Sequence, residues 1–284
     1  MSPDIEHLQT WIGREQRTED FINLFQARAL AAMLGHSVLP SADEPLPPCW
    51  HWLYFLATPA TADTGRDGHS VTGAFLPPVP LPRRMWASGV LEFIKPLRLT
   101  AVAERHSTIR SVDLKSGSAG ALVFVTLEHR LLQDGQLCLR EEQTLVYRSI
   151  PATATPLVPG TPAPRDADHS YSIPLTPILL FRFSALTYNS HRIHYDREYA
   201  VREEFYPGLV LQAPLQAILL LDVAQRISPS APIHRFSFRA VRPVIDVGDL
   251  TLRGKQNGNE LRLCTADHQN YLGVHAVAVL GNPV

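Results

Sequence analysis

Apolar and polar positions in the first part of the chain change from a helical period to a strand period. Apolar side chains recur at helical spacing over residues 20–35, and Asp20 stands near the start of this segment. Residues 48–57, PCWHWLYFLA, are almost entirely apolar and indicate a buried helix that includes His51. After a polar loop with glycines come segments rich in Val, Leu, Phe and Thr and divided by turn sequences: 87–97, 105–114, 120–133 and 135–150. This order predicts helices followed by an antiparallel meander.

The second part repeats that order of elements without repeating the amino-acid sequence. Residues 177–188 favour a strand, 197–205 a short helix and 213–227 a strongly apolar helix. Four further strand patterns follow, at 233–244, 249–258, 259–269 and 271–281. We expect each sheet to curl around one central helix, which places the chain in the α+β class.

A proline-rich segment separates the two parts. Residues 149–170 contain prolines at 151, 156, 159, 162 and 164, with Thr, Ala and Gly between them. Proline cannot donate to a backbone ladder, so this composition favours extended chain. The predicted organisation is residues 1–150, a linker at 151–170 and residues 171–284.

Composition and charge limit the classes of protein to which the chain can belong. A net charge of −1 argues against a broadly basic nucleic-acid surface, although a few arginines could meet a small anionic ligand. No apolar run reaches the roughly 20 residues of a membrane helix, and the N-terminal sequence lacks the order of a secretory signal. Cys49, Cys138 and Cys264 are widely spaced, which favours reduced thiols, no disulfide and a cytoplasmic location.

The densest polar chemistry lies at residues 183–200, FSALTYNSHRIHYDREYA. Asp196 is placed to cap the short helix that follows, because a carboxylate accepts free N–H groups at a helix start. His191 is expected to be a solvent-facing loop residue. His194 follows the apolar Ile193 between two elements, where a side chain can be fixed against a buried helix.

These residues carry a resemblance. Thr187-x-Asn-x-His-Arg-Ile-His-Tyr-Asp196, then a short helix and the segment 206–214, resembles the hydratase motif of the MaoC-like, R-specific enoyl-CoA hydratases. More narrowly, the sequence of this motif is similar to that of a branch that includes mitochondrial 3-hydroxyacyl-thioester dehydratase and bacterial mesaconyl-C4-CoA (itaconyl-CoA) hydratases. Residues 81–89, LPRRMWASG, with Phe93 and 95–97, resemble a second segment of that branch. The resemblance implies a double hot-dog fold: two antiparallel sheets, each bent around a central helix, with the motif kept only in the second half.

Two positions depart from the wider family. That family uses Asp-x4-His, whereas this chain has Asn189 ahead of His194. Asparagine has no titratable proton, so it can orient a water but cannot act as a general acid. Gln212-Ala213 stands where the wider family has His-Gly ahead of its central helix.

The resemblance implies roles for site residues. Hydration of an α,β-unsaturated thioester needs a base for water, expected to be His194, and Asn189 would hold the same water through its carbonyl. The Ala213 N–H at the start of the 213–227 helix would stabilise the enolate oxygen. The expected substrate-binding residues are Arg83, Arg84, Trp86, Arg192, Gly208 and Gln212, the arginines being suited to carboxylate and phosphate groups.

The expected function is an acyl-CoA hydratase that interconverts citramalyl-CoA with itaconyl-CoA or mesaconyl-C4-CoA plus water. CoA is part of this substrate, no metal or redox cofactor is expected, and no acids or cysteines in the sequence clearly complete a metal site with His191 and His194. The partners are the thioester and a second copy in a homodimer, not nucleic acid or membrane. Three alternatives remain: a dehydratase of fatty 3-hydroxyacyl thioesters, a hot-dog thioesterase, and a non-catalytic acyl-CoA-binding module.

Overall fold

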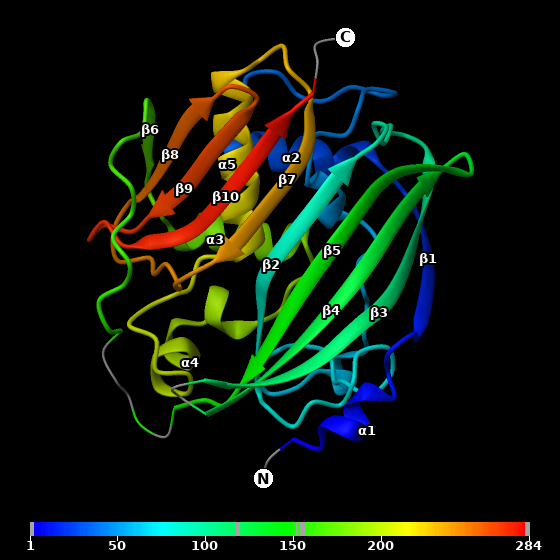
Figure 1. The fold of residues 1–284 in the computed structure, drawn as a ribbon, viewed down its shortest axis with the longest axis vertical. Coiled ribbons are helices and arrows are strands. Elements are labelled where there is room, and N and C mark those ends of the chain that lie inside the picture. Colours follow the sequence, from blue (N-terminus) through cyan, green and yellow to red (C-terminus); the bar gives the residue numbers. More distant parts are fainter. Residues whose placement is uncertain (1–2, 118–119, 152, 154–156, 282–284) are drawn as a thin grey trace.

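One ten-stranded antiparallel sheet forms the centre of the molecule (Figure 1). The computed structural model describes residues 3–117, 120–151, 153 and 157–281. The strand order is β1-β3-β4-β5-β2-β7-β10-β9-β8-β6. The strands are β1 Glu15–Phe21, β2 Arg83–Phe93, β3 Val102–Gly117, β4 Gly120–Gln133, β5 Gln136–Arg148, β6 His169–Ile173, β7 Ile233–Ala240, β8 Leu250–Asn257, β9 Glu260–Ala266 and β10 Leu272–Leu280.

The sheets of the two halves join edge to edge. Residues 88–92 of β2 pair antiparallel with residues 235–239 of β7, so the ladder runs through both halves without a break. Gly89 lies opposite Phe238, and a Cβ on Gly89 would stand 2.5 Å from the phenylalanine ring. The missing side chain therefore leaves the room that Phe238 fills at this join.

Helix α5, Ala213–Ile227, is the central helix of the second half and has the predicted bounds. It packs against β8, β9 and β10, and nine of its residues are buried. Figure 1 shows it behind that part of the sheet, together with α2 and α3. Burial on nearly all sides explains why the segment reads as continuously apolar.

The helices of the first half are shorter than predicted. Helix α2 spans Leu24–Leu34, and Asn23 caps it, while Asp20 lies in β1 and accepts the Phe55 N–H at 2.7 Å. Residues 49–55 are mostly buried, but only Trp50–Leu53 (η1) forms a 3-10 turn. Two more short helices, α1 Ile5–Gln9 and η2 Thr61–Asp63, were not predicted.

The prediction of a strand at residues 177–188 was wrong. Pro177–Leu186 forms helix α3, with the Thr176 hydroxyl accepting the Leu179 N–H and Pro177 in the first turn. Short apolar runs fit a buried strand and a buried helix equally well, and here the cap and the proline decide for a helix. The change matters because α3, not a strand, leads into the motif.

The linker region contributes one strand. Residues 169–173 form β6, which pairs with β8 at the outer edge of the sheet. The predicted linker at 151–170 includes residues 152 and 154–156, with Pro156, which lie outside the described residues. The division of the chain at this linker stays a prediction.

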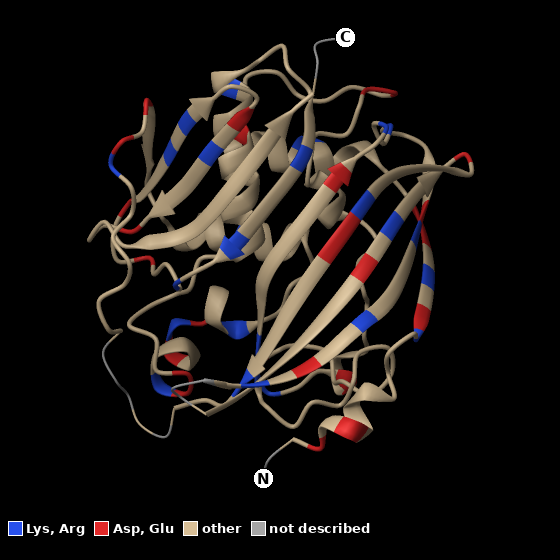
Figure 2. Cartoon of the chain, viewed as in Figure 1, with Lys and Arg blue, Asp and Glu red and all other residues tan. Residues whose placement is uncertain are grey.

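Surface charge is mixed. Lys and Arg alternate with Asp and Glu along β2 to β5 in Figure 2, with pairs such as Arg110 to Glu128 at 2.6 Å. None of the helices in the described part of the chain is long and apolar enough to cross a bilayer. The three cysteines are buried and unpaired.

Candidate active site

The motif segment folds into two short helical pieces after α3. Arg192–His194 forms the 3-10 turn η3, and Arg197–Arg202 forms α4. The Asp196 carboxylate accepts the Tyr199 N–H at 3.0 Å, which confirms Asp196 as the cap of α4. The Val210 N–H donates to the Ile193 carbonyl at 2.9 Å, which ties the motif to the chain just before α5.

His194 is buried with a fixed ring. Its Nδ1 lies 2.6 Å from the Val210 carbonyl oxygen, which can only accept, so Nδ1 carries the proton and Nε2 the lone pair. Burial, and then the neighbouring His191, lower the pKa of His194 to about 3. The imidazole is therefore neutral near pH 7, with Nε2 available as a hydrogen-bond acceptor or base.

His191 is not the solvent-facing residue that we expected. The residue is 3% exposed, and its Nε2 lies 3.1 Å from Glu204 Oε1. The His191 ring stands edge-on to His194, with centroids 5.3 Å apart. The loop position suggested exposure, but a segment from the other half of the chain covers it.

A buried ion pair between Arg83 and Glu204 lies next to His191. Arg83 Nε donates to Glu204 Oε2 at 3.0 Å, and both side chains are almost fully buried. Burial raises the pKa of Glu204, but the hydrogen bond from His191 and the charges of His191 and Arg83 outweigh it, so the net pKa is lowered. Glu204 is thus an anion between two positive or polarisable partners.

The covering segment is the loop at residues 65–70 of the first half. The Arg192 N–H donates to the Asp67 carbonyl at 2.8 Å, and Arg192 Nη1 donates to the Arg66 carbonyl at 3.2 Å. The Ser190 hydroxyl donates to the Gly68 carbonyl. Backbone contacts therefore dock this loop directly on the motif.

Gly68 makes the close approach possible. Its φ is +90°, and a Cβ there would lie 1.8 Å from the Ser190 carbonyl oxygen. Gly68→Ala is expected to lift the loop, because strain at positive φ of about 1–2 kcal/mol adds to a clash with backbone. Tryptic cleavage after the exposed Arg66 should become faster.

Gly13→Ala is the matched control for this prediction. Gly13 has φ +83°, but no atom lies within 4 Å of the position that a Cβ would take, so this variant shares the strain and not the clash. Cleavage after Arg66 at the parent rate in Gly68→Ala, with both variants equally destabilised, would show that the loop is not held at this contact.

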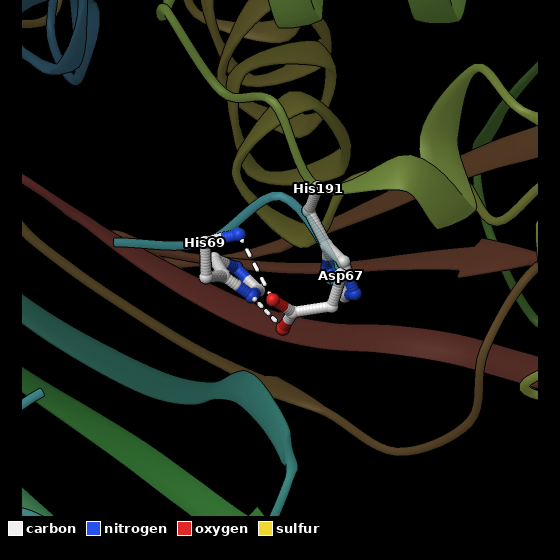
Figure 3. A group of neighbouring side chains, drawn as sticks. All are labelled: Asp67, His69 and His191. Atoms are coloured by element: carbon white, nitrogen blue, oxygen red, sulfur yellow. Dashed lines mark hydrogen bonds and ion pairs between the residues drawn. The ribbon is translucent and has the colours of Figure 1, made fainter. Parts of the chain in front are cut away.

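The docked loop places Asp67 and His69 beside His191 (Figure 3). His69 Nδ1 lies 2.8 Å from Asp67 Oδ2, and the His69 backbone N–H donates to Asp67 Oδ1 at 3.0 Å. The rings of His69 and His191 have centroids 4.0 Å apart. Ligand atoms of these three residues lie within 4.8 Å of one another, a donor set for a metal ion that sequence spacing did not reveal.

The charge states of the pair follow from burial and contact. Burial and then the charge of His191 lower the pKa of His69 to about 4, against the opposing effect of Asp67. Burial raises the pKa of Asp67, but the hydrogen bonds and charge of His69 bring it down to about 2. Near pH 7 Asp67 is ionised and His69 is neutral.

A pocket of about 650 Å³ opens beside this cluster. One wall comes from the first half, including His69 and Arg84, and the other from the α3 end and the motif, including Asn189 and Arg192. Arg66 also lines it. Both halves of the chain therefore build the pocket.

Asn189 and the start of α5 lie on the second-half side. Asn189 Oδ1 accepts the His191 N–H at 3.1 Å, a bond that fixes the orientation of the amide and does not involve its NH₂ group. Gln212 Nε2 donates to the pocket-lining Ser184 Oγ at 2.9 Å, and its side chain does not cap α5. Among the described residues, no side chain accepts a hydrogen bond from the backbone N–H of Ala213, the first residue of α5.

Four expected substrate-binding residues do not line the pocket: Gln212, described above, and Arg83, Trp86 and Gly208. Arg83 is held in the ion pair with Glu204. The Trp86 ring packs against Trp52 and Phe238 at the join of the two sheets. Gly208 is buried, and a Cβ there would stand 2.7 Å from Asp246 Oδ1, so its lack of a side chain leaves room for this carboxylate.

Sequence reasoning missed Asp67, His69 and Glu204. The first two lie in a loop that we described only as polar and glycine-containing, and their sequence, GRDGHS, matches no motif that we considered. Glu204 was treated as part of a helix pattern. The only signal was the presence of titratable residues between glycines, which became informative once the fold placed the loop on the motif.

Comparison with known proteins gives the family. The model of hydroxyacyl-thioester dehydratase type 2 matches residues 49–246. Mesaconyl-C(4)-CoA hydratase of Chloroflexus aurantiacus is 45% identical over 273 residues, covering 95% of this chain and 97% of that protein. The mitochondrial hydroxyacyl-thioester dehydratase type 2 of Schizosaccharomyces pombe is 31% identical over 240 residues, covering 75% and 79%.

Solved structures agree on the fold. HtdX of Mycobacterium tuberculosis aligns with a TM-score of 0.67 at 17% identity, covering 93% of this chain and 99% of that one. A MaoC-like dehydratase of Phytophthora capsici aligns with a TM-score of 0.68 at 11% identity, covering 98% of each. The expected double hot-dog fold is confirmed. The chain belongs to the hydroxyacyl-thioester dehydratase type 2 family, a MaoC-like branch, and is a hydro-lyase.

Proposed function

We propose that the protein is an acyl-CoA hydratase that interconverts citramalyl-CoA with itaconyl-CoA or mesaconyl-C4-CoA plus water. The observation that carries this proposal is the pocket lined by Asn189 and three arginines and built partly by the motif segment, which also carries the buried His194. The 45% identity to a mesaconyl-C(4)-CoA hydratase supports the substrate class.

In this proposal His194 activates the water. Its Nε2 lone pair accepts an O–H of the water as the oxygen attacks Cβ of the unsaturated thioester. The Asn189 NH₂ group donates to the water oxygen and holds it in place, because its carbonyl is already engaged by the His191 N–H. The asparagine therefore positions the water and takes no proton.

Negative charge that develops on the thioester oxygen needs a donor. We assign this role to the Ala213 N–H, which lies at the start of α5, where the helix dipole favours a negative charge. The Val210 carbonyl that holds His194 lies three positions earlier in the chain, so the base and the oxyanion donor are positioned by the same segment.

Arg84 is the arginine best suited to the free carboxylate of a dicarboxylic acyl group. Arg66 is paired with Glu203 at 2.7 Å, and Arg192 with Asp196 at 2.8 Å. No salt bridge involves Arg84 within the described residues, although it lines the pocket. An arginine without a carboxylate partner in the protein can offer its guanidinium fork to a substrate carboxylate.

Arg84→Met is therefore expected to change substrate preference. Loss of a charge-assisted hydrogen bond of roughly 1.5–3 kcal/mol should lower kcat/KM for mesaconyl-C4-CoA and itaconyl-CoA by about 10- to 100-fold. Crotonyl-CoA has no free carboxylate, so its kcat/KM should change little. Steady-state kinetics on the three thioesters measures both effects, and equal losses on all three would assign Arg84 to CoA or to folding instead.

The second candidate is a dehydratase of fatty 3-hydroxyacyl thioesters. The matching family model and the Schizosaccharomyces pombe relative carry that description. A panel of crotonyl-CoA, longer trans-2-enoyl-CoAs and their acyl-carrier-protein forms, assayed beside the C5 dicarboxylyl-CoAs, separates the two candidates. Rates that rise with chain length would favour the second.

Other properties of the enzyme stay predictions. They are a homodimer, a cytoplasmic location, and catalysis without a metal or redox cofactor. Size-exclusion chromatography with light scattering tests the first, and hydration rates before and after treatment with a chelator test the last.

A further inference from the structure

Proton transfer in the hydratase proposed above forms a protonated histidine, and the motif alone does not stabilise that cation. A histidine that takes a proton from water becomes an imidazolium. His194 is buried, its Nδ1 partner is a neutral carbonyl, and Asn189 stands where the wider family has a carboxylate. Without a nearby anion, a buried cation is costly.

A carboxylate-backed histidine does face the pocket, and it comes from the other half of the chain. Both oxygens of Asp67 hold His69, one by the backbone N–H and the other by Nδ1. These contacts fix the ring and leave Nε2 without a hydrogen-bond partner in the described part of the chain. Pairing of this kind fixes the tautomer of an imidazole and stabilises its protonated form.

We propose that His69, positioned by Asp67, is a catalytic residue that carries the transferred proton of the hydration reaction. The inference rests on the proposed function. In hydration of the α,β-unsaturated mesaconyl-C4-CoA the water oxygen bonds to Cβ, its O–H breaks toward His69 Nε2, and the C=C electrons form an enolate with the charge on the thioester oxygen. The Nε2–H then breaks as the enolate electrons form the Cα–H bond and the C=O bond is restored, which returns His69 to its neutral form and adds one water in total.

In this scheme the two histidines act on one water molecule. His194 Nε2 accepts the O–H that remains in the product hydroxyl, whereas His69 Nε2 takes the O–H that is broken. Both rings must offer an Nε2 lone pair at the start, and their contacts meet that need: Nδ1 of His194 faces the Val210 carbonyl, and Nδ1 of His69 faces the Asp67 carboxylate. The charge of Asp67 then opposes the cost of forming the His69 imidazolium.

The same cluster could instead bind a metal ion, but its contacts favour the proton role. Asp67 Oδ2 already bonds His69 Nδ1, and His191 Nε2 is engaged by Glu204. A metal at these three residues would have to break or rearrange the bond between Asp67 and His69. Chelator and added zinc therefore belong in the test.

The test uses the full chain and compares four variants with the parent. His69→Gln is expected to lower kcat for hydration by about 10²- to 10⁴-fold with little change in KM. Asp67→Asn should lower kcat by about 10- to 100-fold, because it removes one charge-assisted hydrogen bond. His106→Gln is the control, since His106 pairs with Glu104 at 2.9 Å on a surface strand away from the pocket, and it should keep the parent rate.

Imidazole rescue separates proton transfer from a merely structural role. In the fourth variant, His69→Ala, added imidazole should raise the rate along a saturating curve, because the small base enters the space left by the ring. In Asp67→Asn, the pKa of the His69 ring, measured by proton NMR titration, should be lower than in the parent. Circular dichroism and thermal unfolding check that each variant is folded.

Several results would overturn the proposal. They are a parent-like kcat in His69→Gln, a failure of imidazole to rescue His69→Ala, or activity lost to a chelator and restored by zinc. A parent enzyme that hydrates none of the thioesters would instead reject the proposed function, and the role of His69 with it. That result is distinct, because it appears before any variant is made.

Discussion

Replacing His194 by glutamine is expected to lower kcat for hydration by about 10²- to 10³-fold, the usual loss when one positioned hydrogen-bonding group is removed from the reacting atoms. Glutamine keeps a polar group of similar reach but loses the Nε2 lone pair that the Val210 contact exposes. Because the pKa of His194 is about 3, the parent imidazole is neutral throughout pH 6–8. Ionisation of this group should therefore not reduce kcat/KM between pH 8 and pH 6.

Steady-state kinetics with a matched control checks this result. His275→Gln lies on the exposed face of β10 and should keep the parent rate. Near-parent kcat in a folded His194→Gln would remove the histidine from the chemistry. A steep loss of rate from pH 8 to pH 6 in the parent would contradict a neutral resting base.

Arg83→Met is expected to cost about 3–5 kcal/mol of stability, the largest folding effect that the site predicts. It removes the cation from Glu204 and leaves a buried carboxylate with His191 as a partner. The pKa of Glu204 is lowered in the fold, so its contribution is present above its unfolded pKa of about 4.3 and is lost as pH falls through the folded value. Chemical denaturation at pH 7 and at pH 4 measures both effects.

The gap in stability between parent and Arg83→Met should narrow at the lower pH, because protonation of Glu204 removes the unpaired charge. Arg98→Met is the control. Arg98 pairs with Asp134 at 2.6 Å on an exposed surface, where such pairs contribute up to about 1 kcal/mol. Equal losses in the two variants would mean that the Arg83 pair is no more important than a surface contact.

The sequence predicted the elements that have a clear hydrophobic period or clear turn residues at their ends. Helix α5 has the predicted bounds because its run is long and apolar, and β4 matches the segment 120–133 between two turns. Helix α3 was mistaken for a strand because ten mostly apolar residues fit both periods. Strands β1 and β6 are short, polar edge strands whose pairing depends on distant partners, so no local pattern marked them.

The same limit applies to the site. Asn189, His194 and Ala213 come from one continuous motif, so the resemblance could place them in order along the chain. Asp67 and His69 join the site because Arg192 and Ser190 bond to the loop that carries them, for Arg192 and Asp67 across 125 positions of sequence (192 − 67 = 125). Arg83 was expected to bind substrate because it stands beside Arg84, but successive residues of a strand point to opposite faces, and only Arg84 lines the pocket.

The central claim is hydration of a C5 dicarboxylyl thioester. It is tested most directly by kcat/KM of the purified protein for mesaconyl-C4-CoA and itaconyl-CoA, measured beside crotonyl-CoA under the same conditions. We predict formation of citramalyl-CoA with a kcat/KM at least about tenfold above that for crotonyl-CoA, the lower bound for one charge-assisted hydrogen bond to the carboxylate. A preference for crotonyl-CoA or longer chains, or release of free CoA in place of hydration, would contradict it.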